Sequence, residues 1–214
     1  MLRQITAPKT DSPKKILIFG NSLALHSPAP DIGWTGDWGM AASRPENDFA
    51  HVLAALLAKE YGDIDCAVSQ GAEWERHISD EGYLAANYAD AAAFSPDIAF
   101  IRIGENVPAE EMEKRPLKDA FIQLINFLTP RPGSRAVVSD MFWKHPAKDT
   151  PAREAADETG SAFAVISDLG LFDENKAIGQ FEHQGVASHP SDAGMRRIAE
   201  RLFNAAMDLK KLPF

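Results

Sequence analysis

The amino-acid sequence predicts an α/β protein in which a parallel sheet carries helices on both faces. Short apolar runs alternate along the chain with segments of helical periodicity. No internal repeat and no linker interrupts this alternation. The pattern is typical of parallel strands joined by right-handed helical crossovers. Binding sites in such sheets lie beyond the carboxyl ends of the strands, so the residues that follow each strand are the first candidates for function.

The expected strands are short and apolar. The first is the run Ile-Leu-Ile-Phe at residues 16–19, which stops abruptly at Gly20-Asn21-Ser22. Further strands are expected at residues 64–69, 97–103, 136–139 and 163–166. Apolar runs of this length, bounded by turn-forming residues, fit strands that are buried on both faces.

The expected helices lie between these strands. The first runs from Asn47, a capping residue, to about Glu60, and Gly62 closes it. Others are expected around residues 82–94, over the apolar stripe of residues 117–128, from Thr150-Pro151 to Gly160, and after Ser191. Residues 23–46 form a long loop rich in glycine, proline and tryptophan; a loop of that length is usually functional or disordered.

The chain is expected to form a single domain over residues 14–214. Its 214 residues, 45% hydrophobic and 25% charged, are enough for a full core. Residues 1–13 are polar, contain two prolines and are expected to form a flexible arm.

Composition also limits the partners. A net charge of -9 and a pI of about 5.1 argue against nucleic acid and anionic membranes, which both require a basic face. No stretch approaches the ~18 apolar residues of a membrane span, and no signal peptide is recognisable, so we expect a cytoplasmic protein, or an exported one if a leader has been removed. No cofactor is expected, because metal-ligand spacings and glycine-rich phosphate loops are missing from the sequence.

Ser22 and His189 are the candidate catalytic residues. Ser22 directly follows the first buried strand, where an α/β protein would place a nucleophile. A serine hydroxyl needs a base to accept its proton. Position singles out His189 among the six histidines, because it lies in the loop that enters the last helix and the fold can return it to the first strand. Either residue alone would fit an ordinary turn or cap.

Three groups are candidates for an oxyanion hole, which binds the negative oxygen that forms when an ester carbonyl is attacked. They are the backbone N–H of Ser22, the backbone N–H of Gly71 after the second strand, and the side-chain amide of Asn106 after the third strand. Singly, Gly71 and Asn106 would be turn residues, so the hypothesis rests on their joint order.

That order resembles the SGNH hydrolase superfamily, also called GDSL esterases. Its four motifs correspond to Gly20-Asn21-Ser22, Gly71, Gly104-Glu105-Asn106 and His189, and the resemblance spans residues 15–205. It implies a flavodoxin-like three-layer α/β/α sandwich that hydrolyses ester-linked acyl groups. The run from Gly33 to Ser43 is similar to a bacterial subgroup often associated with carbohydrate deacetylation.

Two departures from the family pattern are present. Asn21 replaces the usual aspartate beside the nucleophile, and Val186 stands where the family places an aspartate three residues before the histidine. Three explanations are open for the second. A backbone carbonyl near Val186 holds the imidazole in a Ser–His dyad, or Glu182 or Asp192 replaces the acid, or the site is inactive. We favour the dyad and then Glu182.

Four aromatic residues are candidates for substrate binding: Trp34 and Trp38 in the long loop, and Phe142 and Trp143 after the fourth strand. They would either wall a sugar or acyl group or simply close this edge of the sheet. The sequence thus predicts a serine esterase acting on a small-molecule or carbohydrate ester. The alternatives are a thioesterase or lipase-like acylhydrolase, and a binding protein with a degenerate site.

Overall fold

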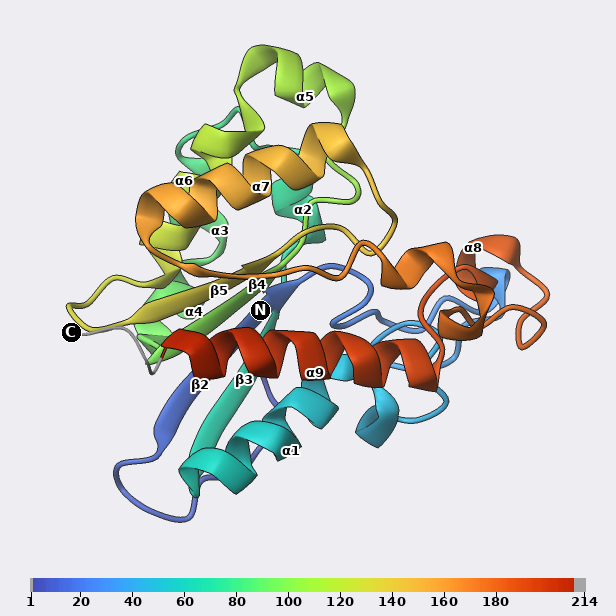
Figure 1. Cartoon of the computed structure of the whole chain (residues 1–214), viewed down its shortest axis with the longest axis horizontal. Coiled ribbons are helices and arrows are strands. Elements are labelled where there is room, and N and C mark those ends of the chain that lie inside the picture. Colours follow the sequence, from blue (N-terminus) through green and yellow to red (C-terminus); the bar gives the residue numbers. More distant parts are fainter. Residues whose placement is uncertain (1, 210–214) are drawn as a thin grey trace.

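The computed structural model describes residues 2–209, and its centre is a six-stranded, mostly parallel sheet (Figure 1). The strands are β1 (Leu2–Gln4), β2 (Lys14–Gly20), β3 (Ile64–Gln70), β4 (Ile98–Arg102), β5 (Arg135–Ser139) and β6 (Ala162–Ala164). Their order across the sheet is β1-β3-β2-β4-β5-β6, and only the edge strand β1 is antiparallel. The five parallel strands follow the order of flavodoxin-like sheets.

Both faces of the sheet are buried under helices. Along β2, Ile16 and Ile18 belong to one hydrophobic core, whereas Leu17 and Phe19 belong to the other, as the alternation of side chains along a strand requires. The first core includes α1 (Phe49–Tyr61) and α9 (Asp192–Leu209). The second includes α4 (Ala89–Phe94), α6 (Leu117–Leu128) and α7 (Pro146–Thr159). Figure 1 shows the resulting layers, so the expected three-layer α/β/α sandwich is confirmed.

The remaining α-helices are α2 (Ala72–Glu75), α3 (Tyr83–Asn87), α5 (Ala109–Lys114) and α8 (Gln184–Ala187). Short 3-10 turns occur at η1 (Pro30–Ile32), η2 (Pro45–Asn47), η3 (Leu169–Leu171) and η4 (Asp173–Asn175). No helix within residues 2–209 combines the length and apolar composition needed to cross a bilayer.

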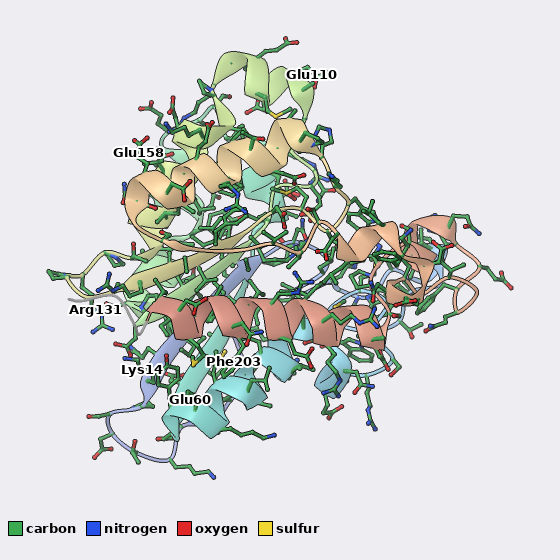
Figure 2. The ribbon with its side chains drawn as sticks, in the orientation of Figure 1. Lys14, Glu60, Glu110, Arg131, Glu158 and Phe203 are labelled. Carbon is green, nitrogen blue, oxygen red and sulfur yellow. The ribbon has the colours of Figure 1, made fainter. Side chains whose placement is uncertain are left out.

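The connections diverge between β2 and β4. The chain leaves β2 toward α1 on one face, and it leaves β4 toward α6 on the other. Parallel sheets form a ligand-binding crevice at such a switch point. Ser22 follows β2 and Asn106 follows β4. Lys14 and Arg131 lie at the opposite end of the sheet, where both approach Asp97 (Figure 2).

Four expectations need correction. Leu2–Gln4 is not part of a loose arm, because it pairs with β3. Asp48, not Asn47, caps α1 by accepting the N–H of His51 at 2.8 Å. The fourth helix of the prediction does not start at Thr150-Pro151: α7 begins at Pro146, and Asp149 reaches back to the N–H of His145 at 2.7 Å. The last strand ends at Ala164, two residues before the expected limit.

The long loop after β2 is ordered by a small core of its own. Trp34, Met40 and Ala41 from the loop pack with Ala177 and Val186. This cluster joins the loop to the segment around α8, which projects beyond the end of the sheet in Figure 1. The segment that contains His189 therefore rests on the loop that follows Ser22.

Candidate active site

A tight turn after β2 presents Ser22. The N–H groups of Ala24 and Leu25 both donate to the carbonyl of Asn21, which turns the chain at once. Gly20 permits this turn, because a Cβ there would lie 2.7 Å from Cβ of Ala24 and 3.0 Å from the carbonyl oxygen of Arg102. The hydroxyl of Ser22 lies 2.9 Å from Nε2 of His189. The two candidates from opposite ends of the chain thus meet in hydrogen-bonding geometry.

The other ring nitrogen of His189 determines the tautomer. Nδ1 lies 2.7 Å from the carbonyl oxygen of Gly185. A carbonyl only accepts hydrogen bonds, so Nδ1 carries the proton and the neutral ring keeps a lone pair on Nε2. That lone pair faces the hydroxyl of Ser22. A backbone carbonyl therefore occupies the place that an acid would have beside the imidazole.

Neither candidate acid takes this position. Asp192 accepts two hydrogen bonds from Ser43, one from the backbone N–H at 2.8 Å and one from the side-chain hydroxyl at 2.7 Å. It also accepts the side-chain amide of Asn47 at 2.8 Å, so it anchors the long loop to the start of α9. Glu182 is exposed and lines a neighbouring cavity. The hydrogen bond to Gly185 is the arrangement that the dyad hypothesis requires.

Burial keeps the base neutral. Desolvation of the imidazole lowers the pKa of His189 to about 4, because burial disfavours the charged ring; the hydrogen bond to Gly185 acts in the opposite direction. Trp143 contributes to this environment, with its ring edge-on to the imidazole at 5.2 Å between centroids. A neutral His189 can accept a proton over a wide pH range.

Two of the three expected oxyanion donors are available. Within residues 2–209, the backbone N–H of Ser22 has no hydrogen-bond partner. Nδ2 of Asn106 donates one of its two hydrogens to Glu75 at 2.7 Å, which leaves the second for a ligand. The prediction for Gly71 is wrong, because its N–H donates to the carbonyl of Gly20 at 2.6 Å. Glycine is needed at residue 71 for space, since a Cβ there would lie 2.3 Å from Cε1 of Phe19.

A buried polar network lies beneath these groups, and our sequence analysis did not identify it. Glu75 and Arg102 have no exposed surface, and the side chain of Glu105 is 6% exposed. Arg102 forms an ion pair with Glu105 and donates to Oδ1 of Asn21 at 3.0 Å. Lys148, also buried, donates to the carbonyl of Glu105 at 2.6 Å. The sequence signal was a charged residue, Arg102, inside an otherwise apolar strand.

Asn21 explains one departure from the family pattern. Its Nδ2 donates to Glu75 at 3.2 Å and to Glu105 at 2.7 Å, while its Oδ1 accepts from Arg102. An aspartate could only accept, and it would add a third negative charge beside two carboxylates. The amide is therefore the side chain that this network requires.

A cavity of about 400 Å³ opens over Ser22. Polar and charged side chains form most of its lining, which consists of Ser22, His26, Ile32, Met40, Gln70, Ala72, Glu73, Arg76, Asn106, His183, Gly185, Val186 and His189. The hydroxyl, the imidazole and the Asn106 amide thus share one cavity. The N–H of Ala72 in its wall donates to Oε1 of Gln70 at 2.9 Å.

The expected aromatic wall is not part of this cavity. Trp34 is 2% exposed and Phe142 is fully buried, so both act as core residues. Trp38 is half-buried, and its indole N–H donates to the carbonyl of Ala42 at 2.8 Å. Trp143 is half-buried beside the imidazole. The structure therefore contradicts a substrate-binding wall of Trp34 and Phe142, and it gives the other two packing contacts.

A second cavity of about 620 Å³ adjoins the first. Ile32 and His183 line both cavities. The remaining lining consists of Pro30, Asp31, Gly33, Gln180, Phe181 and Glu182. The ring of Phe181 packs on Trp34 with centroids 6.1 Å apart, which ties this wall to the small core of the long loop. Among residues 2–209, no cluster of His, Cys, Asp and Glu could hold a metal ion.

Comparison with known proteins identifies the fold. No protein-family model and no curated protein sequence matches the chain. Solved structures with the same fold include LAE5, an alpha/beta hydrolase enzyme from the metagenome of Lake Arreo in Spain, with a TM-score of 0.58 and 16% identity over 92% of this chain and 96% of that one. A candidate GDSL-like lipase from Parabacteroides merdae gives a TM-score of 0.57 and 16% identity over 94% and 99%.

A third solved structure is a two-domain esterase active on acetylated mannans, co-crystallised with mannopentaose. It gives a TM-score of 0.57 and 14% identity over 94% of this chain and 50% of that one. Identities this low show a common fold. The neighbours with this fold are an alpha/beta hydrolase, a candidate lipase and an esterase.

Proposed function

We propose that the chain is an SGNH-type serine esterase that works through an acyl-enzyme on Ser22. The observation that carries the proposal is the pair of hydrogen bonds to His189. One fixes the proton on Nδ1, and the other directs the free Nε2 at the hydroxyl of Ser22. This is the arrangement in which an imidazole can take the proton of a serine as it attacks.

The reaction follows from this geometry. Oγ of Ser22 attacks the ester carbonyl while its proton moves to Nε2 of His189. The Ser22 N–H and the Asn106 amide bind the negative carbonyl oxygen. The imidazolium returns its proton to the departing alcohol, and an acyl-serine remains. Water then attacks the acyl-serine while its proton moves to Nε2 of His189. The imidazolium returns this proton to Oγ of Ser22, and the carboxylic acid leaves.

We infer that the substrate is a small acyl ester, such as an acetate, on a polar alcohol such as a carbohydrate. The polar lining of the catalytic cavity supports this, because His26, Gln70, Glu73 and Arg76 offer hydrogen bonds to hydroxyl groups. The adjoining second cavity offers further room for the alcohol. The intact Ser22–His189 pair favours an enzyme over a binding protein with a degenerate site.

Hydrolysis of p-nitrophenyl acetate tests the proposal directly. We expect measurable turnover by the wild type and loss of nearly all turnover in Ser22→Ala, with the thermal unfolding temperature unchanged within a few degrees. A fluorophosphonate should label Ser22 and no other serine, as read by peptide mass spectrometry. Retention of more than a few percent of turnover by Ser22→Ala would exclude this serine as the nucleophile.

A further inference from the structure

Glu75 is the buried carboxylate that the reaction does not use directly. It ends α2 and has no exposed surface. Its Oε1 accepts the backbone N–H of Gly104 at 2.8 Å, the backbone N–H of Asn106 at 3.0 Å and the amide of Asn21 at 3.2 Å. A fourth hydrogen bond comes from the side-chain amide of Asn106. The four bonds tie Glu75, which follows β3, to the segments that follow β2 and β4.

Oε2 of Glu75 has a single partner among the described residues, and that partner is Nδ2 of Asn106 at 2.7 Å. An asparagine amide can present either its oxygen or its nitrogen, but a carboxylate can only accept. A reversed Asn106 amide would set two acceptor oxygens against each other. The carboxylate therefore selects the orientation with nitrogen toward Glu75, and the second hydrogen of Nδ2 remains for the cavity that Asn106 lines.

We propose that Glu75 is a positioning residue, which fixes the amide of Asn106 as an oxyanion donor before substrate arrives. The inference rests on the proposed esterase function. Preorganised donors act strongly because they need no rearrangement when charge develops on the carbonyl oxygen. Glu75 acts through Asn106 and is not in the lining of the catalytic cavity.

The carboxyl group of Glu75 lies among other buried charged side chains. Burial and the nearby Glu105 raise the pKa of Glu75. Arg102 and Lys148 lie in the same buried network, so two carboxylates are matched by two cations. Asn21 belongs to this balance, because it donates to both carboxylates.

A double-mutant cycle on the full chain tests the proposal. The variants are Glu75→Gln, Asn106→Ala and the pair together, assayed with p-nitrophenyl acetate. The glutamine has one acceptor oxygen, and with that oxygen in the place of Oε1 its nitrogen would face Nδ2 of Asn106. We expect kcat to fall about tenfold to a hundredfold in Glu75→Gln, and KM to change less than about threefold.

The matched control is Glu111→Gln. Glu111 is also a buried glutamate that accepts a backbone N–H, from Ser79 at 3.0 Å, but it lies on α5 and does not line the catalytic cavity. We expect this variant to lose thermal stability and to keep kcat. The double variant should lose no more kcat than Asn106→Ala alone, because the two residues act as one unit. The proposal would be overturned if the double variant lost kcat by the product of the two single losses, or if kcat were unchanged in Glu75→Gln.

A measurement on the wild-type protein tests the proposal without relying on the folding of Glu75→Gln or on the esterase assay. In a ¹⁵N NMR spectrum, the side-chain amide pair of Asn106, assigned by its loss in Asn106→Ala, should show one proton shifted downfield and slow to exchange. Two protons at the positions of a solvent-exposed amide would overturn the proposal. A downfield proton in a protein that hydrolyses no ester would leave the hydrogen bond standing and refute the proposed function.

Discussion

At the scale of single residues, the contact between His189 and Gly185 replaces a carboxylate. A backbone carbonyl can hold the imidazole and fix its tautomer, but it brings no full negative charge to stabilise the imidazolium. Removing the acid of a Ser–His–Asp triad lowers kcat by about 10⁴. In the proposed mechanism, the base lacks that contribution and depends on its orientation alone.

The first prediction concerns the two acidic side chains near the base. Glu182→Gln and Asp192→Asn should each retain most of the turnover of p-nitrophenyl acetate, whereas His189→Ala should lose nearly all of it. The reason is that Asp192 bonds Ser43 and Asn47, and Glu182 faces a different cavity. Steady-state kinetics of the three purified variants provide the comparison. A loss approaching 10⁴-fold in either carboxylate variant would identify that residue as the third member of a triad.

The second prediction concerns pH. His189 must be neutral to accept the proton of Ser22, and desolvation lowers its pKa to about 4. The acid limb of kcat/KM should therefore have its midpoint near pH 4, with activity constant from about pH 5.5 up through pH 6.5, the usual pKa of histidine. Circular dichroism at each pH checks that the fold persists.

Trp143→Ala provides the companion to that pH profile. Removing the indole that packs on the imidazole lets water reach the ring, so the acid limb should move up toward pH 6.5. A wild-type limb already at pH 6.5, or a limb that does not move in Trp143→Ala, would show that burial does not control the base.

At the scale of secondary-structure elements, Asp48 joins the first helix to the active-site loop. Its buried carboxylate caps α1 and also accepts the N–H of Gly39 at 3.1 Å. The next residue, Met40, donates to the carbonyl of Ser22 at 2.9 Å. The start of α1 therefore positions the loop that borders the nucleophile.

The third prediction follows from this connection. Asp48→Ala should lower the free energy of unfolding by about 2 kcal/mol, because the helix loses its cap and buried N–H groups lose their acceptor. Urea denaturation followed by circular dichroism measures the change. Asp37→Ala is the control, since the side chain of Asp37 is 59% exposed and, among residues 2–209, forms an ion pair only with Arg3, so it should change stability by less than about 0.5 kcal/mol. Equal losses in the two variants would contradict the special role of Asp48.

The sequence predicted the strands and helices correctly where burial imposes a periodic pattern of apolar residues. Strands β2 to β5 and helices α1, α6 and α9 all lie where continuous apolar runs or one-sided stripes placed them. The prediction failed where a local hydrogen bond decided the outcome. The start of α7 depends on Asp149 reaching back to His145, and the pairing of residues 2–4 depends on a free sheet edge. Neither contact leaves a periodic signal.

The same contrast holds within the candidate site. The order of motifs along the chain placed Ser22, His189 and Asn106 together, because the fold brings the ends of strands to one edge. The same order of motifs suggested Gly71, but the structure shows its N–H engaged by the carbonyl of Gly20. The aromatic residues were assigned by residue type, and Trp34 and Phe142 are buried in the core. Glu75 and Lys148 were not predicted as part of the site. They lie on separate helices, α2 and α7, and no spacing in the sequence connects them.

At the scale of the whole molecule, a second cavity lies beside the catalytic cavity, between the long loop and the segment before α8. Ile32 and His183 form their shared wall. A small acyl group occupies only the space next to Ser22, so an alcohol of several sugar units would extend from there into the second cavity. Asp31, Gln180 and Glu182 offer hydrogen-bonding groups there, and the ring of Phe181 offers an apolar face.

The last prediction separates this alcohol site from the chemistry. The double variant Asp31→Ala, Gln180→Ala should lower kcat/KM for an acetylated oligosaccharide about thirtyfold, because two hydrogen bonds of roughly 1 kcal/mol each are lost. The change should appear mainly in KM, as expected for binding that is equal in the ground and transition states. Turnover of p-nitrophenyl acetate, which has no sugar, should stay within about twofold of wild type. The control is Glu113→Ala, which removes an exposed carboxylate on α5 and should leave the kinetics on both substrates unchanged. Equal losses on both substrates would indicate damage to the catalytic centre, and unchanged kinetics on the oligosaccharide would exclude the second cavity as the place where the alcohol binds.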